Sequence, residues 1–185
     1  MGVLLPVLLS FLNDAGYLPE GFSYTPNKTQ TYVQMTNALS SIATSSPFQV
    51  SKVVDGDTVD LTQGDITVRV RLIGINSPES VDPRRKVECF GKEASLHAKE
   101  LLSGKTVTVK LDPSQDTYDK YQRLLAYIVL PDGTSFNQEM IEEGYAYEYT
   151  YDRPYTYQKI FKSAQVTARD KQLGLWSPQT CDGKK

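Results

Sequence analysis

The sequence predicts a domain of the α+β class that is mainly β, and three observations support this prediction. Five segments after residue 47 have the β-branched and aromatic composition of strands, with alternation or short apolar runs. A segment with helical spacing separates the third strand from the fourth, and two further helical segments follow the fifth. A chain of 185 residues with 39% hydrophobic and 23% charged residues has an ordinary globular composition and can hold one well-packed domain.

Residues 1–47 are predicted to form an extension, with two short helices over 3–13 and 29–42 and a linker. The apolar run over residues 4–12 is too short to span a bilayer. It resembles the core of a signal peptide in length, although no Lys or Arg precedes it and no small-x-small cleavage site follows. A partial signal segment and a short amphipathic helix that packs on the domain therefore both remain open.

The first half of the predicted domain contains three strands, at residues 49–54, 58–61 and 66–73. A Gln-Gly-Asp turn joins the second strand to the third. A polar loop over 76–88 follows, and residues 91–102 have apolar side chains at helical spacing, with Gly104 placed to end the helix.

Two more strands follow, at 105–111 and 123–130, and the sequence PDG after them is a strong turn signal. A short helix is predicted over 136–143 and a longer one over 155–171. Five strands with a helix between the third and the fourth suit a five-stranded Greek-key barrel of the oligonucleotide/oligosaccharide-binding (OB) type. The predicted barrel domain spans residues 48–180, and residues 181–185 form a tail.

The composition limits the chemistry that the chain can perform. One histidine, His97, and two cysteines are too few for a zinc site of the usual Cys/His spacing. The net charge is −2, but residues 153–185 hold seven basic residues against two acidic ones, and a local basic surface can attract phosphates. A catalyst built from this chain must work mainly with carboxylates, arginines, hydroxyls and a hard metal ion.

Residues that could perform such chemistry gather at strand ends and in loops: the D-G-D-T turn at 55–58, Arg71, the loop residues 76–79 and the D-K-Y-Q-R segment at 119–123. Singly, each has an ordinary structural explanation, such as a common turn or a surface ion pair at a sheet edge. Together they meet the requirements of phosphodiester hydrolysis. Two guanidinium groups can neutralise a pentacoordinate phosphorus, a carboxylate can hold or deprotonate the attacking water, and oxygen ligands suit Ca²⁺.

Five sequence blocks, in this order and spacing, closely resemble the staphylococcal-nuclease-like (thermonuclease) family: VVDGDTVDL, VRLIGINSPE, CFGKEAS, DKYQRLLAYIVLPDG and GLWS. The resemblance covers about residues 48–178. It implies an OB-fold barrel with three helices and a Ca²⁺-dependent endonuclease that acts on DNA and RNA. Members of the family cut the bond between phosphorus and O5′ and leave 3′-phosphate ends.

The resemblance also implies roles for particular residues. Asp57 matches a calcium ligand, Asn76 stands where the family usually has a second aspartate ligand, and Ser77 stands where a threonine offers its backbone carbonyl. Glu79 matches the glutamate that acts as general base or orients the water.

Two arginines, Arg71 and Arg123, match the residues that bind the phosphate and stabilise the transition state. Four further residues match or lie near positions that contact the nucleotide: Lys120, Tyr121, Tyr149 and Tyr151.

Cys89 and Cys181 are expected to form a disulfide, since a cysteine pair occupies similar places in some relatives; two free thiols are the alternative. A disulfide favours an oxidising compartment, so the protein is expected to be secreted or in the cell envelope. The expected partners are DNA and RNA, with single strands favoured, and a monomer without a stable protein partner is expected. The rival interpretation is a catalytically weak nucleic-acid-binding module, but the presence of both arginines, the glutamate and one aspartate favours an enzyme.

Overall fold

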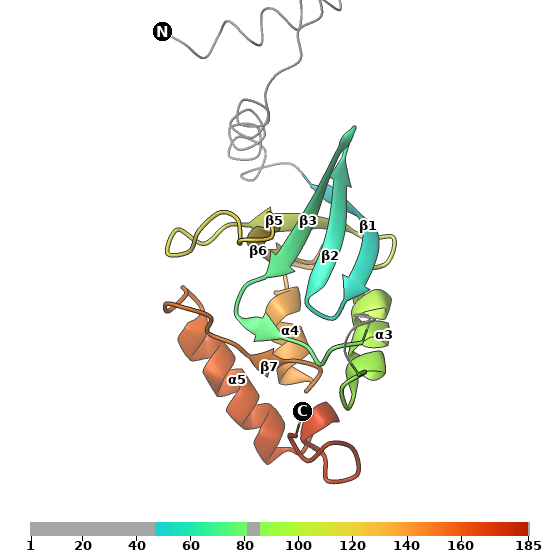
Figure 1. Ribbon diagram of the computed structural model, residues 1–185, viewed down its shortest axis with the longest axis vertical. Coiled ribbons are helices and arrows are strands. Elements are labelled where there is room, and N and C mark those ends of the chain that lie inside the picture. The colour runs from blue at the N-terminus through green and yellow to red at the C-terminus, as the bar shows by residue number, and fades with distance from the viewer. Residues whose placement is uncertain (1–46, 81–85, 185) are drawn as a thin grey trace, which may run out of the picture. The chain divides into compact units, whose positions relative to one another are not determined.

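The computed structural model describes residues 47–80 and 86–184 (Figure 1). The chain divides into two compact units, Met1–Ile42 and Ala43–Lys185. The predicted N-terminal helices and the apolar run over residues 4–12 lie outside the described residues. In the described part of the chain, no helix is long and apolar enough to cross a membrane.

Five strands of the described part close into a barrel, which confirms the predicted fold class. Around the barrel the order is β1 (Phe48–Asp55), β2 (Thr58–Gln63), β3 (Ile66–Leu72), β6 (Leu124–Val129) and β5 (Thr106–Lys110). Strand β5 pairs back with β1 and closes the ring. All neighbouring strands are antiparallel except β3 and β6, which run parallel.

Alternation along the strands explains which residues fill the barrel. In β3 the side chains of Val68, Val70 and Leu72 are buried, whereas those of Thr67 and Arg69, which alternate with them, are exposed. Strand β1 has irregularities in its register with β2, between Val50 and Lys52 and between Val53 and Asp55. Such bulges bend a strand and redirect its side chains. The acidic end of β1 is thereby buried beside the loop that follows β3.

Three α-helices of the described part lie at one end of the barrel (Figure 1): α3 (Gly91–Leu102), α4 (Phe136–Glu142) and α5 (Gln158–Asp170). The first two match the prediction to within one residue. Buried Asn137 fixes α4 to the barrel, because its Oδ1 accepts a hydrogen bond from Ile128 N (3.0 Å) and its Nδ2 donates to Ile73 O (2.9 Å). Helix α4 is therefore bonded both to β6 and to the segment directly after β3, close in sequence to Arg71 of the predicted site.

Helix α5 begins three residues later than predicted, because Tyr155 packs against the barrel instead of opening the helix. Tyr155 is buried, and its hydroxyl lies 3.3 Å from Gly74 O and 3.0 Å from Glu148 Oε1. Gly74 has φ +78°, and a Cβ atom there would lie 2.6 Å from the Tyr155 ring. The tyrosine ring and the glycine therefore require each other at this position.

Two short strands and a 3₁₀ helix escaped prediction: β4 (Ile75–Asn76), β7 (Tyr147–Glu148) and η1 (Gly174–Trp176). Two-residue strands carry no readable alternation. Strands β4 and β7 pair antiparallel, with Asn76 opposite Tyr147. This pairing brings the segment after β3 next to the tyrosine-rich segment that precedes α5, although some 70 residues separate them in the sequence.

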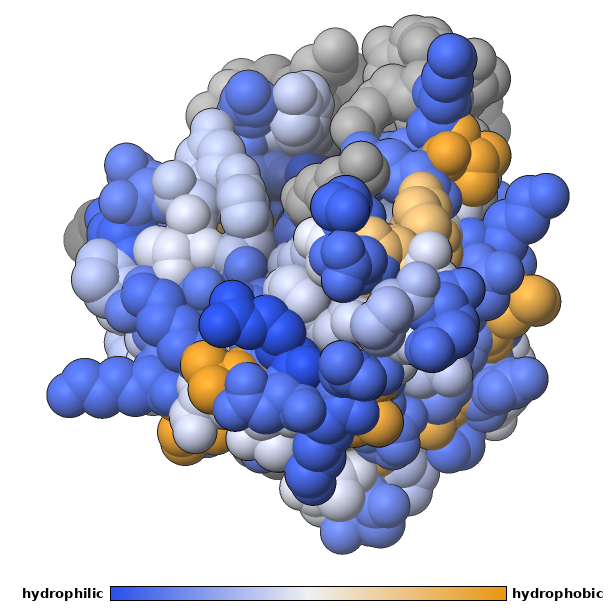
Figure 2. Space-filling model, turned by 90° about the horizontal axis from the view of Figure 1, so that it is seen from below, coloured by the Kyte–Doolittle hydropathy of each residue, from blue (hydrophilic) through white to orange (hydrophobic). Residues whose placement is uncertain are grey.

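The described surface is mainly hydrophilic on the face shown in Figure 2, where apolar residues form small separate patches. On α5 the exposed apolar residues are Ile160 and Val166, whereas Phe161, Ala164 and Ala168 are buried. Helix α5 is therefore an amphipathic helix that packs one face against the core.

Candidate active site

Arg71, near the end of β3, is held in a fixed orientation by the backbone around it. Its Nη1 donates to the carbonyl oxygens of Leu72 (2.7 Å) and Ile75 (2.8 Å), and its Nη2 lies 3.2 Å from Asp57 Oδ2. Only 15% of the side chain is exposed. A guanidinium with this many fixed contacts presents its remaining donors in one direction and needs little reorganisation to bind an anion.

Asp57 lies in the turn between β1 and β2 and connects it to the loop after β4. Its Oδ2 accepts a hydrogen bond from Ser77 N (3.0 Å), and its Oδ1 accepts one from Thr58 Oγ1 (3.0 Å). The approach of the two loops requires glycine at position 56, since a Cβ atom there would lie 2.6 Å from Ser77 Cβ. The sequence D-G-D-T therefore has a geometric reason beyond turn propensity.

The oxygen atoms around Asp57 fit a hard cation. Ser77 Oγ is buried and has no hydrogen-bond partner within the described part of the chain. The amide oxygen of Asn76 lies 3.5 Å from Arg71 Nη2, a long contact that leaves this oxygen able to bind a cation. Carboxylate, amide and hydroxyl oxygens are the ligands that Ca²⁺ prefers. Residues 47–80 and 86–184 hold no group of three or more His, Cys, Asp or Glu suited to a metal ion, and this set contains one carboxylate, that of Asp57.

Asp55 adds negative charge next to this set, and sequence reasoning did not assign it a role. Its Oδ1 accepts hydrogen bonds from Gly56 N (2.8 Å) and Ser80 Oγ (2.9 Å). Burial is the main cause that raises the pKa of Asp55 to about 6; the charges of Asp57 and Glu79 add to the rise, and the hydrogen bonds from Gly56 and Ser80 oppose it. The neighbouring charges contribute to this rise, so negative groups lie close together at this end of β1. The acid that opens the D-G-D turn was the available signal.

Glu79 lies in the loop that follows β4, and its backbone is held on both sides by Glu88. Glu79 N donates to Glu88 Oε2 (3.0 Å), and Glu88 N donates to Glu79 O (2.8 Å). The Glu79 carboxylate accepts a hydrogen bond from Ser80 N at Oε1 (3.0 Å). The position of this carboxylate therefore depends on the turn that contains Glu88.

Arg123, directly before β6, is oriented by Asp119. Its Nε and Nη2 lie 2.7 and 2.6 Å from Asp119 Oδ2, and its backbone N donates to Asp119 Oδ1 (2.9 Å). The ring of Tyr121 lies over both Arg123 (5.3 Å from Cζ to the ring centroid) and Lys120 (5.1 Å from Nζ). Sequence reasoning did not assign Asp119 a role; an acid four residues before an arginine was the signal.

A cleft of about 480 Å³ brings most of the predicted site residues together. It is lined by Arg71, Asn76, Lys120, Tyr121, Arg123, Tyr149 and Tyr151. The rings of Tyr149 and Tyr151 are 41% and 75% exposed, with centroids 6.3 Å apart. Asp57 and Ser77 do not line the cleft but are buried next to Arg71, and Glu79 follows them along the chain. Two oriented guanidinium groups open into one cleft, next to oxygen ligands.

This fold and site define an OB-type barrel protein whose cleft is suited to a phosphate group. The chain belongs to the staphylococcal nuclease family, since the family model described as staphylococcal nuclease homologue matches residues 69–178. The match confirms the predicted family.

Curated relatives agree with this assignment. The chain is 37% identical over 129 residues to a thermonuclease of Staphylococcus intermedius, covering 70% of this chain and 75% of that protein. It is 34% identical over 135 residues to a thermonuclease of Staphylococcus hyicus, covering 73% and 78%. It is 34% identical over 129 residues to the SPbeta prophage-derived endonuclease YokF of Bacillus subtilis (strain 168), covering 69% and 43%. Family and relatives together confirm the predicted enzyme class, a nuclease hydrolase.

Proposed function

We propose that this protein is a Ca²⁺-dependent endonuclease that hydrolyses phosphodiester bonds of DNA and RNA and leaves 3′-phosphate ends. One observation carries the proposal: Arg71 and Arg123, each oriented by its own aspartate, open into the same cleft. The names of the relatives, thermonuclease and endonuclease, support it.

In the proposed mechanism the two arginines bind the phosphate oxygens and stabilise the charge that develops on the pentacoordinate phosphorus. Because Asp57 and Asp119 already fix these guanidinium groups, little reorganisation is needed during the reaction. Glu79 orients the attacking water and accepts its proton, while the water oxygen bonds to phosphorus and the bond to O5′ breaks. Asp57, Asn76 and Ser77 would hold Ca²⁺, which when bound polarises a phosphate oxygen.

The rim of the cleft supports a preference for single strands. Tyr121, Tyr149 and Tyr151 present exposed rings, and Lys120 presents an ammonium group beside the first of them. Unpaired bases can stack on such rings while the backbone follows the positive groups, whereas bases in a duplex are already stacked. We propose that the enzyme acts as a monomer on single-stranded segments of DNA and RNA.

The decisive experiment incubates the protein with end-labelled single-stranded DNA or RNA, in Ca²⁺ or in EDTA, and analyses the products. We expect cleavage in Ca²⁺ and none in EDTA. Treatment of the products with a 3′-phosphatase should show that they carry 3′-phosphates. Binding without cleavage in both conditions would instead support the rival function, a nucleic-acid-binding module that lacks turnover.

Replacing Glu79 by glutamine is expected to slow turnover about 10²–10⁴-fold, the usual contribution of a general acid or base. Oligonucleotide affinity should stay the same or rise slightly, because a negative group near the phosphate is removed. Single-turnover cleavage and equilibrium binding of the same labelled oligonucleotide measure the two effects separately. Equal rates for the variant and the parent across pH would rule out a base role for Glu79.

Replacing Asn76 by aspartate is expected to lower the Ca²⁺ concentration for half-maximal activity by about tenfold, since affinity tracks the charge of the ligands. The two side chains share one shape, and position 76 lies beside Asp57 and Arg71. A Ca²⁺ titration of activity decides the matter. Superimposable curves for the two proteins would show that the side chain at position 76 does not touch the metal.

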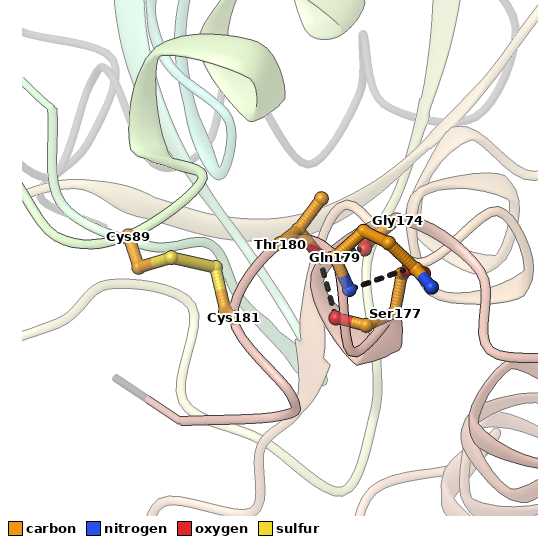
Figure 3. The surroundings of a disulfide bond; sticks show 6 residues. All are labelled: Cys89, Gly174, Ser177, Gln179, Thr180 and Cys181. Carbon is orange, nitrogen blue, oxygen red and sulfur yellow. Dashed lines mark hydrogen bonds between the residues drawn. A yellow bond between two sulfur atoms is a disulfide. The ribbon is translucent and has the colours of Figure 1, made fainter.

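We also propose that the Cys89–Cys181 bond forms in the natural protein, which would then be secreted or lie in the cell envelope. The two sulfur atoms are bonded in the structure across 92 residues of sequence (Figure 3). Closing a loop of this length stabilises a domain by about 4–5 kcal/mol in the chain-entropy model. Titration with Ellman's reagent of the unfolded, unreduced protein is expected to find no free thiol. Two thiols per chain would contradict the pairing.

A further inference from the structure

Two hydrogen bonds attach the backbone of Glu79 to Glu88. The Glu79 amide donates to the Glu88 carboxylate, and the Glu79 carbonyl accepts from the Glu88 amide, at 3.0 and 2.8 Å. The two hydrogen bonds form a closed pair around the peptide groups of Glu79. A shift of Glu88 would therefore move the backbone from which the Glu79 carboxylate projects.

Close packing leaves this attachment little freedom. A Cβ atom at Gly91, the first residue of α3, would lie 2.5 Å from Glu79 O, so the start of the helix rests directly on Glu79. Gly91 N donates to Glu88 O (3.0 Å), which closes the turn over residues 88–91. Glu88, the turn and the start of α3 therefore form one rigid support under Glu79.

The disulfide anchors this support from its other side. Cys89 directly follows Glu88 and is bonded to Cys181 in the C-terminal turn (Figure 3). That turn is itself fixed, since Thr180 Oγ1 donates to Gly174 O (2.6 Å) and Ser177 O (3.0 Å). The next residue after Gly174, buried Leu175, donates its N–H to Gly144 O (2.9 Å), at the end of α4.

We propose that Glu88 is a positioning residue for Glu79 and that the Cys89–Cys181 bond maintains this positioning, which makes hydrolysis sensitive to redox state. The inference rests on the proposed function, in which Glu79 handles the water. A 1 Å misplacement of a catalytic group can cost about 10²-fold in rate, so a support of this kind has a measurable effect. The effect should appear in kcat, because Glu88 does not line the cleft that binds the substrate.

The redox step needs only a dithiol reductant. A thiolate of the dithiol attacks a sulfur of the bond, and the second thiol closes the reductant into its own disulfide. Two electrons and two protons pass to the protein, which gains two thiols at positions 89 and 181. Cys89 is exposed, whereas Cys181 is buried, so Cys89 is the sulfur open to attack.

The first test compares Glu88→Ala, Glu88→Gln and the control Glu93→Ala, whose side chain is exposed on the first turn of α3. Glu88→Ala is expected to lower kcat about 10- to 100-fold with KM changed less than about twofold. Glu88→Gln keeps an acceptor oxygen for the Glu79 amide and should retain kcat within about threefold, as should Glu93→Ala.

Amide hydrogen exchange gives a measurement that does not depend on activity. The Glu79 amide should exchange slowly in the parent and in Glu88→Gln, and at least about tenfold faster in Glu88→Ala, while amides of β2 are unchanged. If the parent cleaves nucleic acid and Glu88→Ala keeps its kcat, or if Glu79 stays protected in that variant, the positioning role is overturned. If the parent does not cleave in Ca²⁺, it is the proposed function that fails.

The second test reduces the disulfide with dithiothreitol, well below the melting temperature of the reduced protein. Reduction is expected to lower kcat of the parent at least about fivefold, reversibly on reoxidation, and to change kcat of Glu88→Ala by less than about twofold. This non-additivity follows if the disulfide acts through Glu88. Equal factors in both proteins, or a fall in melting temperature with kcat unchanged, would overturn the redox part of the proposal.

Discussion

Replacing Arg71 or Arg123 by alanine is expected to lower kcat about 10²–10³-fold, the usual cost of removing one preorganised donor to a developing oxyanion. Each guanidinium is fixed before substrate arrives, Arg71 by two backbone carbonyls and Asp57, and Arg123 by Asp119. Lysine should rescue little at either position, because a point charge does not reproduce the bidentate geometry. Steady-state cleavage of a single-stranded oligonucleotide in saturating Ca²⁺ measures the effect.

Arg69 provides a matched control two residues away on the same strand. It pairs with Asp60 through Nε (2.7 Å) and Nη2 (2.9 Å), and 51% of its side chain is exposed. Because an exposed ion pair contributes about 0–1 kcal/mol, Arg69→Ala should leave both kcat and stability nearly unchanged. Arg71→Ala also removes the donor from two carbonyls, so its melting temperature must be measured. Parental rates in both Arg71→Ala and Arg123→Ala would show that the cleft is not the active site.

The strands could be predicted because the alternation of apolar and polar residues within a strand indicates which side of it faces the core. Val68, Val70 and Leu72 alternate with polar residues, and this alternation predicts a strand with one buried face, whichever strands lie next to it. The start of α5 could not be found in the same way. Tyr155 suits a helix as well as any aromatic residue, and its contacts with Glu148 and with Gly74, 81 residues away in the sequence, hold it outside the helix.

The candidate site was predicted from five sequence blocks taken together. The contacts between these blocks were not predicted. The pair Asn76 and Tyr147 of β4 and β7 has no local signal, because two residues cannot show a period. Asp119 opens a recognised block and Glu88 directly precedes one, but their roles come from the hydrogen bonds that they make. The sequence pattern predicted residues that line the cleft, such as Arg71 and Arg123, but not those that orient them, since a supporting contact leaves no pattern of its own.

Asp112 is one such supporting residue, and replacing it by alanine is expected to lower the free energy of unfolding by about 3–5 kcal/mol at pH 7. The buried carboxylate accepts hydrogen bonds from Tyr127 OH (2.5 Å), Thr156 N (2.8 Å), Thr156 Oγ1 (2.7 Å), Ser114 N (2.9 Å) and Ser114 Oγ (2.8 Å). Alanine would leave these donors without their acceptor, and an unsatisfied buried donor costs about 1–3 kcal/mol. The segments that Asp112 joins include Gln115, Asp116 and Arg153, which line the cleft, so KM should rise as well. Urea unfolding and oligonucleotide kinetics measure the two effects.

The pH dependence of the stabilisation tests whether it comes from the negative charge of the Asp112 carboxylate. Burial alone would raise the pKa of Asp112, but the hydrogen bonds from Tyr127, Thr156 and Ser114 outweigh it and hold this pKa below its usual range. A lowered pKa in the folded state means that the stabilisation is complete above the unfolded value of about 4 and is lost as the pH falls below it. The difference in unfolding free energy between the parent and Asp112→Ala should therefore be largest near pH 7 and smaller at pH 3. Asp132 forms a similar local turn with Thr134 but is exposed, so Asp132→Ala should lower the free energy of unfolding much less than Asp112→Ala does. A loss at position 112 that is no larger than this control, or one that is constant from pH 3 to pH 7, would contradict the role of a buried anionic acceptor.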